Sequence, residues 1–524
     1  MSIGFFVGSQ LTKDGSTLLG GFGHEPSSHW IDIVPGQHHP PGSTMKVGVT
    51  EEANIPGRII DIPQVQYTNK YISSTYSEYA GFPPPLTNGG LNEYGVAGRD
   101  IWSPSRQELV EMTPEPQQGP NYSDLARIVM ERAKTAREAV EIIGDLIATY
   151  GYSTYGGNSH LFADKDEGWV VIEYAGGQGL WAAERLGPDE VRVSYPGYIH
   201  NFPVDFQSNE NYMGSDNIVE FAREQGWWDP ETDNPEYLNL QDVYGEPFPG
   251  EGVEKQEDHY TAARVPPERE EELMSLVPIS LEDMLALVRD PRWSNDRAGY
   301  GQVAHLRQNV PNELQTLWIA ITGAVTTPYV PIPIVTNSLA VPPEFVQHRY
   351  MTKYSDSEFL SKDYAPQEAT RYAFREFKRL MYFTSEHPLC FLPYVTGNIE
   401  CFEQIMLLER RSLEERFLSL WQNNQFEEAR QLISTKVHQR LLESLRLGMR
   451  LTDVVEAETR RLFGIRMPKD TKEPGETTPP WSQVMISQTD DDFVHAYDPR
   501  LDIYPRPFGI YNQYAWCGPH AYRS

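Results

Sequence analysis

The order of strand and helix signals constrains the fold of this chain more than any other feature. Strand signals come first, an amphipathic helix is predicted over residues 123–150, and strand signals return at 160–163, 169–174, 180–183 and 191–194. The turn DKDEG at 164–168 joins two of these strands as a hairpin. Strands, a helix and then a run of antiparallel strands predict a layered α/β body whose sheet is not simply doubly wound.

The chain opens with a predicted β-hairpin. Residues 3–7 form a short apolar run, KDGS at 13–16 has turn chemistry, and a return strand begins at Thr17. Ser2 therefore stands directly before the first strand. Residues 25–85, rich in Pro, Gly, His and Tyr, predict loops with short strands at 47–50 and 58–61, and the segment NGGLNEYGVAG predicts a strand over 91–98.

The rest of the chain divides by composition. Residues 208–272 are polar and acidic, and we interpret them as an elaborate loop or lid; a helix at 281–289 and strands at 317–322 and 329–334 follow. Charged amphipathic patterns predict helices at 369–382, 399–422, 426–447 and 451–463. We therefore expect a core over 1–365 with an insertion around 208–272, a helical region over 366–466 packed on the core, and an extended arm over 467–524.

The formal net charge of −30, from 44 basic and 74 acidic residues, excludes some partners. Such a surface repels phosphate backbones and anionic lipids, so neither nucleic acid nor a membrane is expected as a partner. The three cysteines have no metal-ligand spacing, and we interpret them as reduced thiols. No signal-peptide pattern is found, so the expected location is the cytoplasm, with the oligomeric state left open.

Ser2 combines two groups that acyl chemistry can use. If Met1 is removed, which a small second residue permits, Ser2 carries both a hydroxyl and a free α-amine. The amine has a reference pKa of about 7.7–8.0, so it is partly neutral near pH 7 and can take the hydroxyl proton without a separate histidine. Ser2 is also the ordinary small residue after an initiator methionine, and this feature alone favours that ordinary interpretation.

Several further segments follow Ser2 in a recognisable order. They are VG at 7–8, DGS at 14–16, NEYGVA at 92–97, RAKTAREA at 132–139, ADKDEGW at 163–169, and residues 260–265 and 329–331. In this order and spacing the chain resembles the N-terminal-nucleophile (Ntn) hydrolase dipeptidases related to penicillin V acylase and secernin. The resemblance covers roughly residues 2–345 and continues more weakly to about 455.

The resemblance implies an α+β fold, a four-layer αββα sandwich whose N-terminal residue sits at the end of a central strand. It implies a hydrolase of small peptide or amide bonds with Ser2 as the catalytic nucleophile, oxyanion donors near Asn92, and Arg264 in the place of the family's distal arginine. Arg264 is equally interpreted as a surface salt-bridge residue. No cofactor or metal is implied.

The chain also departs from the family pattern. Ser2 replaces the family's Cys, so the thiolate advantage is lost. Where the family has Arg and Asp after the first hairpin, this chain has Gly21 and His24, and where it usually has an Asn, this chain has Tyr195 and Pro196. The groups around the nucleophile are therefore rebuilt or lost.

Substitute groups are available nearby in the sequence. His24 is a candidate catalytic base or substrate-orienting group, and the candidate substrate-binding residues are Glu25, Trp102, Tyr195, His200 and Asn201. A lone histidine in a polar loop is more often solvated, and aromatic side chains more often pack in a core. The histidines near residues 24–39 have no carboxylate or cysteine at a metal-ligand spacing, so we expect no metal site.

Two functional hypotheses follow. The first is a hydrolase that forms an acyl-enzyme on Ser2, with acyl transfer to an amine, or a specialised amidase, as close variants. The second is a divergent family member that has lost peptidase chemistry and binds a ligand or a partner. Convergence of His24, Glu25, His200 and Asn201 on Ser2 would favour chemistry, whereas a purely aromatic pocket would favour binding.

Overall fold

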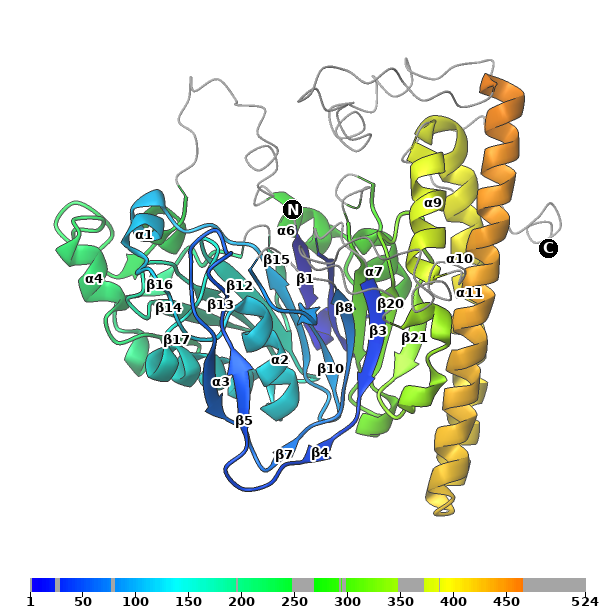
Figure 1. Cartoon of the computed structure of the whole chain (residues 1–524), viewed down its shortest axis with the longest axis horizontal. Helices are drawn as coiled ribbons and strands as arrows, with labels where there is room; N and C mark the ends of the chain where they lie inside the picture. Colours follow the sequence, from blue (N-terminus) through cyan, green and yellow to red (C-terminus); the bar gives the residue numbers. More distant parts are fainter. Residues whose placement is uncertain are drawn as a thin grey trace.

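Two β-sheets packed face to face form the centre of the molecule (Figure 1). The computed structural model describes residues 2–23, 29–76, 81–194, 197–246, 268–291, 294, 298–346, 372–385 and 387–464. Helices cover the outer face of each sheet, and a group of long helices follows in the chain. The predicted fold class, a four-layer αββα sandwich with a helical C-terminal region, is confirmed.

The first sheet has six antiparallel strands and contains the start of the chain. Its strand order is β15 (Val191–Ser194), β1 (Ile3–Val7), β2 (Thr17–Phe22), β19 (Gly301–Leu306), β20 (Thr316–Ala320) and β21 (Val330–Pro333). The hairpin predicted at the start of the chain is thus β1 and β2, placed in the middle of a sheet.

The second sheet has nine strands, again all antiparallel. Its order is β17 (Tyr212–Gly214), β14 (Trp181–Leu186), β13 (Gly168–Glu173), β12 (Asn158–Ala163), β11 (Ala97–Ile101), β10 (Gly89–Asn92), β8 (Tyr71–Tyr76) and β3 (His29–Val34), with β9 (Leu86–Thr87) pairing to β8. Strands β11 and β12 lie across from β1 and β2 of the first sheet.

The central strands are apolar on both faces because both faces are buried. In β1, Phe6 belongs to the core between the sheets, together with Leu19 and Leu161. Ile3 and Phe5 belong to a second core under the helices of the first sheet. A strand buried on both sides reads as a continuous apolar run, which is why residues 3–7 lack strict alternation of apolar and polar residues.

Helices α2 (Tyr122–Arg132) and α3 (Ala136–Tyr150) cover the second sheet. The side chain of Asn121 accepts the backbone N–H groups of Ser123 and Asp124 and so begins α2. The Thr135 hydroxyl accepts the N–H of Glu138 at 3.1 Å and begins α3. The predicted helix over 123–150 is therefore two helices, because the second N-cap restarts the chain after a break.

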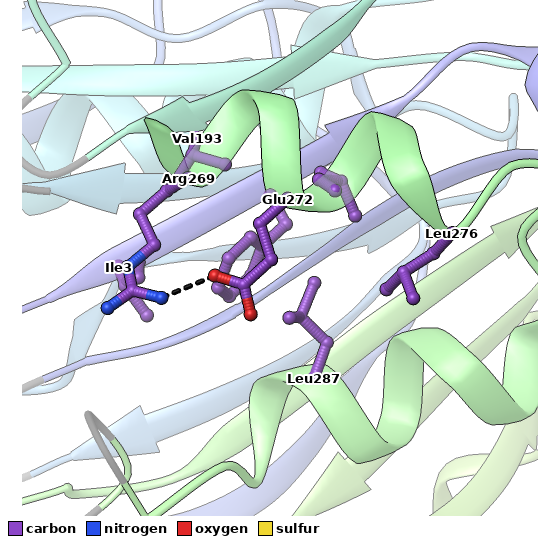
Figure 2. A pocket seen from close by; sticks show the side chains of 8 residues that line it. Ile3, Val193, Arg269, Glu272, Leu276 and Leu287 are labelled. Carbon is purple, nitrogen blue, oxygen red and sulfur yellow. Dashed lines mark hydrogen bonds and ion pairs between the residues drawn. The ribbon is translucent and has the colours of Figure 1, made fainter. Parts of the chain in front are cut away.

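Helices α6 (Glu268–Ser275) and α7 (Leu281–Val288) cover the first sheet. Figure 2 shows α6 lying over Ile3 and Val193, with the ion pair between Arg269 and Glu272 at a small hollow. Glu270 of α6 also accepts the backbone N–H of Val193 in β15 at 2.9 Å. The outer face of β1 is thus closed by apolar packing, and this hollow is not an opening toward the inner face.

The long helices α9 (Ala373–Ser385), α10 (Pro388–Gln422) and α11 (Phe426–Phe463) pack on one another, and α11 runs beside β21 (Figure 1). The predicted helices at 426–447 and 451–463 are one continuous helix. Gly448 lies in its middle, and a Cβ placed there would lie 2.5 Å from Cε1 of Phe377 in α9. A glycine that looks like a break in the sequence is a close contact between helices.

Short elements complete the described part of the chain. They are the strand pairs β4 (Gln37–His38) with β7 (Tyr67–Thr68), β5 (Thr44–Val47) with β6 (Ile60–Pro63) and β16 (Phe202–Pro203) with β18 (Tyr237–Leu238), and the helices α1 (Gln107–Met112), α4 (Ile218–Glu224) and α5 (Leu240–Tyr244). Residues 208–246 therefore contribute β17, α4, β18 and α5, and the predicted arm over 467–524 lies outside the described residues.

Candidate functional site

Ser2 lies at the buried end of β1. It is 7% exposed and directly precedes the first residue of the strand. Side chains alternate along a strand, so Ser2 and Gly4 belong to the same face as Phe6, the face between the sheets. A Cβ placed on Gly4 would lie 2.5 Å from Cδ1 of Leu161 and 3.0 Å from Cδ1 of Ile101. The face that carries Ser2 therefore looks onto β11 and β12.

Arg99 of β11 crosses the space between the sheets at Gly21 of β2. Gly21 pairs with Gly4 and has a φ of 151°, a backbone conformation that L side chains rarely adopt. A Cβ at Gly21 would lie 2.9 Å from Cδ of Arg99 and 2.1 Å from the carbonyl oxygen of Ile3. The stem of Arg99 thus occupies the space that glycine leaves, beside Gly4, two residues along the chain from Ser2.

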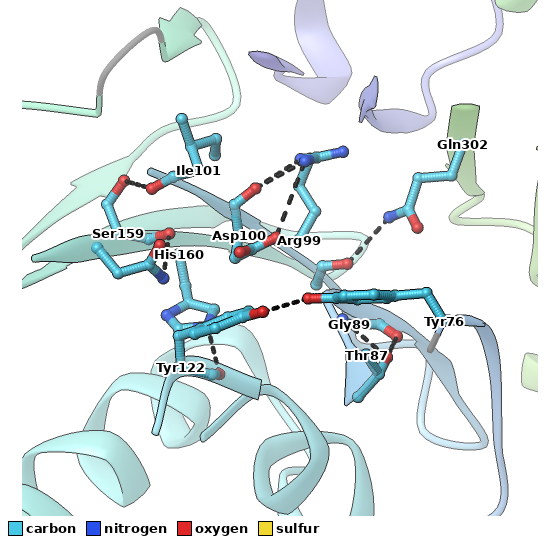
Figure 3. A network of polar contacts seen from close by, with 12 residues as sticks. Tyr76, Thr87, Gly89, Arg99, Asp100, Ile101, Tyr122, Ser159, His160 and Gln302 are labelled. Atoms are coloured by element: carbon cyan, nitrogen blue, oxygen red, sulfur yellow. Dashed lines mark hydrogen bonds and ion pairs between the residues drawn. The ribbon is translucent and has the colours of Figure 1, made fainter. Parts of the chain in front are cut away.

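The Arg99 guanidinium is completely buried. Its Nε and Nη2 donate to the backbone oxygen of Asp100 at 3.1 and 2.7 Å, and Cζ lies 5.6 Å from the ring centroid of Tyr300. Nη1 has no hydrogen-bond partner among the described residues. Gln302 beside it donates its amide to the backbone oxygen of Gly98 at 3.0 Å (Figure 3). The site thus holds a buried cation with one unused donor.

Three buried serines surround Gly197 on the other side of Ser2. Ser194 of β15 pairs with Gly4 of β1, and its hydroxyl has no partner among the described residues. The hydroxyls of Ser103 and Ser159 lie 2.7 Å apart, and Ser103 Oγ accepts the N–H of Gly197 at 3.0 Å. The site thus combines serine hydroxyls, the Arg99 cation and Ser2 at the end of a strand. Such groups can polarise a substrate carbonyl and hold a nucleophile in place.

A buried charged cluster lies behind the site, on the face of β11 that meets α2 (Figure 3). Asp100 pairs across strands with His160, and Nδ1 of His160 lies 2.7 Å from Oε1 of Glu173. Burial raises the pKa of Asp100 to about 6, against the lowering effect of the Arg99 and His160 charges. Burial alone would lower the pKa of His160, but the Glu173 and Asp100 carboxylates and the bond to the Tyr122 carbonyl together raise it.

Asn92 lies at the far end of β10 and has a structural task. Its Nδ2 donates to the backbone oxygens of Met130 and Ala133 at 3.2 and 2.7 Å. Its Oδ1 accepts the N–H groups of Tyr94 and Val96 at 3.1 and 3.0 Å. These bonds close a tight turn, which corrects the prediction of one strand over 91–98 to the hairpin β10–β11. They also use both donors of the Asn92 amide, so its side chain has none left for an oxyanion.

The other predicted site residues are spread over several places. Trp102 follows β11 directly and is partly buried. His200 and Asn201 are exposed, and His200 Nδ1 lies 3.4 Å from Oδ1 of Asn239. His24, Glu25, Tyr195 and Arg264 lie outside the described residues. The structure therefore places Arg99 and Ser194 beside the Gly4 position of β1, two residues from Ser2, and the sequence did not single out either of them.

A signal for these residues was present in the sequence. The Arg-Asp pair at 99–100 stands inside the strand AGRDI, between apolar neighbours, where a charged pair is costly unless it has partners. The same holds for His160 in NSHLFA and Glu173 in GWVVIE. The cluster could have been predicted from this pattern of ionisable residues in the middle of apolar strands.

Metal, membrane and cysteine chemistry were also considered. Among the residues that the structure describes, no group of three or more His, Cys, Asp or Glu side chains could hold a metal ion. In the same part of the chain, no helix is both long and apolar enough to cross a bilayer. Cys390 is a free, buried thiol, whereas Cys401 is disulfide-bonded, which corrects the prediction that all the cysteines are reduced.

Comparison with known proteins supports the resemblance seen in the sequence. Residues 87–267 match the model of Peptidase family C69. This range contains Arg99, Asp100, His160 and Glu173 but does not reach Ser2. The predicted resemblance to the Ntn dipeptidases is confirmed by this match and by the similar proteins.

Three similar proteins are dipeptidases by name. A probable dipeptidase B of Streptococcus pyogenes is 26% identical over 225 residues, which is 42% of this chain and 42% of that protein. A probable dipeptidase B of Lactococcus lactis is 33% identical over 138 residues, 26% of this chain and 28% of that protein. A dipeptidase of Bifidobacterium longum is 33% identical over 136 residues, 25% of this chain and 24% of that protein. The match therefore spans less than half the length of these relatives.

Among solved structures, a bile acid hydrolase aligns with this chain. A conjugated bile acid hydrolase from Clostridium perfringens aligns over 68% of this chain and 100% of its own, at 12% identity and a TM-score of 0.28. A score this low carries no argument, and the fold assignment rests on the strand order and the helix layers described above.

Proposed function

Starting from the Peptidase family C69 match over residues 87–267, we propose that this chain hydrolyses small peptide or amide bonds, as a dipeptidase does, with Ser2 as nucleophile. The observation that carries the proposal is the position of Ser2. It lies at the buried end of a central strand, 7% exposed, on the inner face that it shares with Gly4. Arg99 and Ser194 lie beside that strand end.

The proposed reaction uses both groups of an N-terminal serine. After removal of Met1, Ser2 Oγ attacks the carbonyl carbon, and its proton passes to the Ser2 α-amine. As the Oγ–C bond forms, the C–N bond breaks and the leaving amine takes that proton. Water then hydrolyses the ester, releases a carboxylic acid and restores the hydroxyl. The oxyanion formed on the way needs donors about 3 Å away.

The remaining predicted residues keep their proposed roles around this reaction. Arg264 would orient the substrate carboxylate or the nucleophile, His24 would serve as a substitute base or substrate-orienting group, and Glu25 would bind the substrate. Trp102 and Tyr195 would line the substrate pocket. His200 and Asn201 are exposed, so we assign them to substrate binding at its entrance rather than to the reacting bond.

The decisive experiment combines intact mass with activity. The natively purified, untagged protein should lack the mass of one methionine, and it should hydrolyse members of a panel of dipeptides and N-acyl amino acids. Ser2→Ala should abolish hydrolysis, because no nucleophile remains, whereas Ser43→Ala, which changes a loop serine bonded to the carbonyl of Pro40, should not.

Each contrary result has its own meaning. Retention of Met1, or full activity of Ser2→Ala, would remove Ser2 from the mechanism. Product that carries an added amine, rather than free acid, would identify acyl transfer. Tight binding of a dipeptide with no turnover and no acyl adduct would favour the alternative, a non-catalytic binding protein.

The cellular setting is also a proposal. We place the protein in the cytoplasm, either as a monomer or as a homo-oligomer, acting on small peptides without nucleic acid or membrane partners. Disulfides are rare in the cytoplasm, so the redox state of Cys401 in freshly lysed cells bears directly on this placement.

A further inference from the structure

The space beside Ser2 is filled in an unusual way. In β2 the residue next to the β1 backbone is Gly21, and no side chain from β2 enters the space between the sheets there. The stem of Arg99 enters it instead, from β11 of the opposite sheet, 2.9 Å from the place of a Gly21 Cβ. Arg99 of the nine-stranded sheet thus fills the space where Gly21 of the six-stranded sheet has no side chain.

The Arg99 guanidinium has one counter-charge among the described residues. This is Asp100, whose Oδ1 lies 4.0 Å from Nη2 in a buried ion pair without a hydrogen bond between the two side chains. Nε and Nη2 are held by a backbone carbonyl, which carries no net charge, and Nη1 has no described partner. The backbone bonds therefore fix the guanidinium in place, and the single ion pair to Asp100 offsets its charge only in part.

Among the described residues, the other charged groups near this end of β1 lie on its outer face, where Arg269 and Glu272 of α6 form an ion pair over Ile3. From the first sheet the neighbours are Gly4, Gly21, Ser194 and Gln302, none of which ionises near neutral pH. His160 and Glu173 lie behind β11 with Asp100, on the face toward α2. His29 lies beyond Tyr300, with their ring centroids 5.5 Å apart.

We infer that Arg99 is the positioning residue for Ser2, supplying from β11 the fixed positive charge that the Gly21 position cannot. The inference rests on the proposed function and names a part of that site. Arg99 acts through Ser2 rather than on the substrate, because it is fully buried. A nearby cation disfavours the charged form of an amine and favours the developing alkoxide. Both effects make Ser2 a better nucleophile with its own amine as base.

The test compares three variants with the wild-type protein. Arg99→Met keeps the stem and removes the charge, and Arg99→Lys keeps the charge. Arg192→Met is the matched control, because Arg192 also spans the two sheets, through a 2.6 Å bond to Glu184, but it pairs with Phe6, farther along β1. All three are first checked for folding by circular dichroism and thermal unfolding.

The main measurement is the pKa of the Ser2 α-amine. It is followed by NMR from 13C-labelled serine, with the Ser2 signal assigned by its loss in Ser2→Ala, and in parallel from the pH profile of kcat/KM. We expect Arg99→Met to raise this pKa by about one unit and to move the acidic limb of the profile by the same amount. Arg99→Lys should restore most of the shift, and Arg192→Met should leave both values unchanged.

The NMR readout separates the two failures. If Met1 is retained, or if Ser2→Ala is active, the proposed function fails and the positioning role fails with it. If Ser2 is N-terminal and required, but its amine pKa is the same in Arg99→Met as in Arg192→Met, the inference alone is overturned. A folded Arg99→Met protein with a lowered kcat and an unshifted pKa would assign Arg99 a purely structural role, which also overturns it.

Discussion

Gly21→Ala probes the close packing of β2 against β1 in the same sheet and against Arg99 of the facing sheet. The added methyl would meet the carbonyl oxygen of Ile3 at 2.1 Å and Cδ of Arg99 at 2.9 Å. The first contact is with backbone in the middle of a sheet, which moves only if the β1–β2 pairing loosens. The φ of 151° adds a separate conformational cost, because a residue with a Cβ rarely adopts it.

The expected magnitude follows from these two costs. A non-glycine residue in such backbone costs roughly 1 kcal/mol, and overpacking a buried site by one methyl costs a further 1–3 kcal/mol. We therefore expect Gly21→Ala to lower the free energy of unfolding by about 3 kcal/mol. If the proposed positioning by Arg99 is right, the same variant also weakens Ser2 chemistry, because the methyl displaces the Arg99 stem.

Urea unfolding followed by fluorescence and circular dichroism measures the effect. The control is Gly15→Ala in the turn between β1 and β2, where φ is 72° but no atom lies within 4 Å of an added Cβ. Gly15→Ala should cost only the conformational part, about 1 kcal/mol. Equal destabilisation by the two variants would refute the close-contact argument, and so would a Gly21→Ala protein as stable as wild type.

Two further predictions concern buried charges. The folded pKa of Asp100, raised by burial from 3.8 to about 6, means that stability falls as pH rises from about 4 to about 6, since the carboxylate then ionises in a buried place. Asp100→Asn should therefore flatten this part of the pH–stability curve and gain about 2 kcal/mol at pH 8 in urea unfolding; an unchanged curve would contradict the assignment. Glu403 accepts Nη1 of Arg289 at 2.9 Å and the N–H of Tyr329 at 2.7 Å. Glu403→Gln should lower the free energy of unfolding by about 3 kcal/mol, because it leaves a buried guanidinium unpaired, and a loss below 1 kcal/mol would argue against this pair as a structural anchor.

The layers of the fold were predictable because they depend on local patterns. The apolar run at 3–7 and the helix signals at 281–289 and 426–463 mark real elements, since burial on one or two faces leaves a direct trace in the sequence. The failures came from single side chains that end an element. Asn92 closes a turn and Thr135 starts a helix, and neither differs in type from residues elsewhere in the chain that do not.

The site was less predictable because it is assembled across the two sheets. Ser2 could be named from its place before a strand, but its neighbour Arg99 is ninety-seven residues away in the chain. Only the pairing of β1 with β2, and the packing of both on β11, brings Arg99 to Gly21. The sequence shows that Gly21 stands where the family that this chain resembles has a polar residue. That Arg99 lies at this position can be seen only in the folded structure.

The two borders of the first sheet bear on how copies of this chain can associate. At one border, Glu270 occupies the N–H of Val193, a donor that an incoming strand would need. At the other, β21 carries Pro331 and Pro333, two residues apart and without N–H groups, and α11 runs alongside. Proline is tolerated at the outer border of a sheet and stops its extension there. The six-stranded sheet is thus finished at both ends, so an assembly of this chain would not form by adding strands to this sheet.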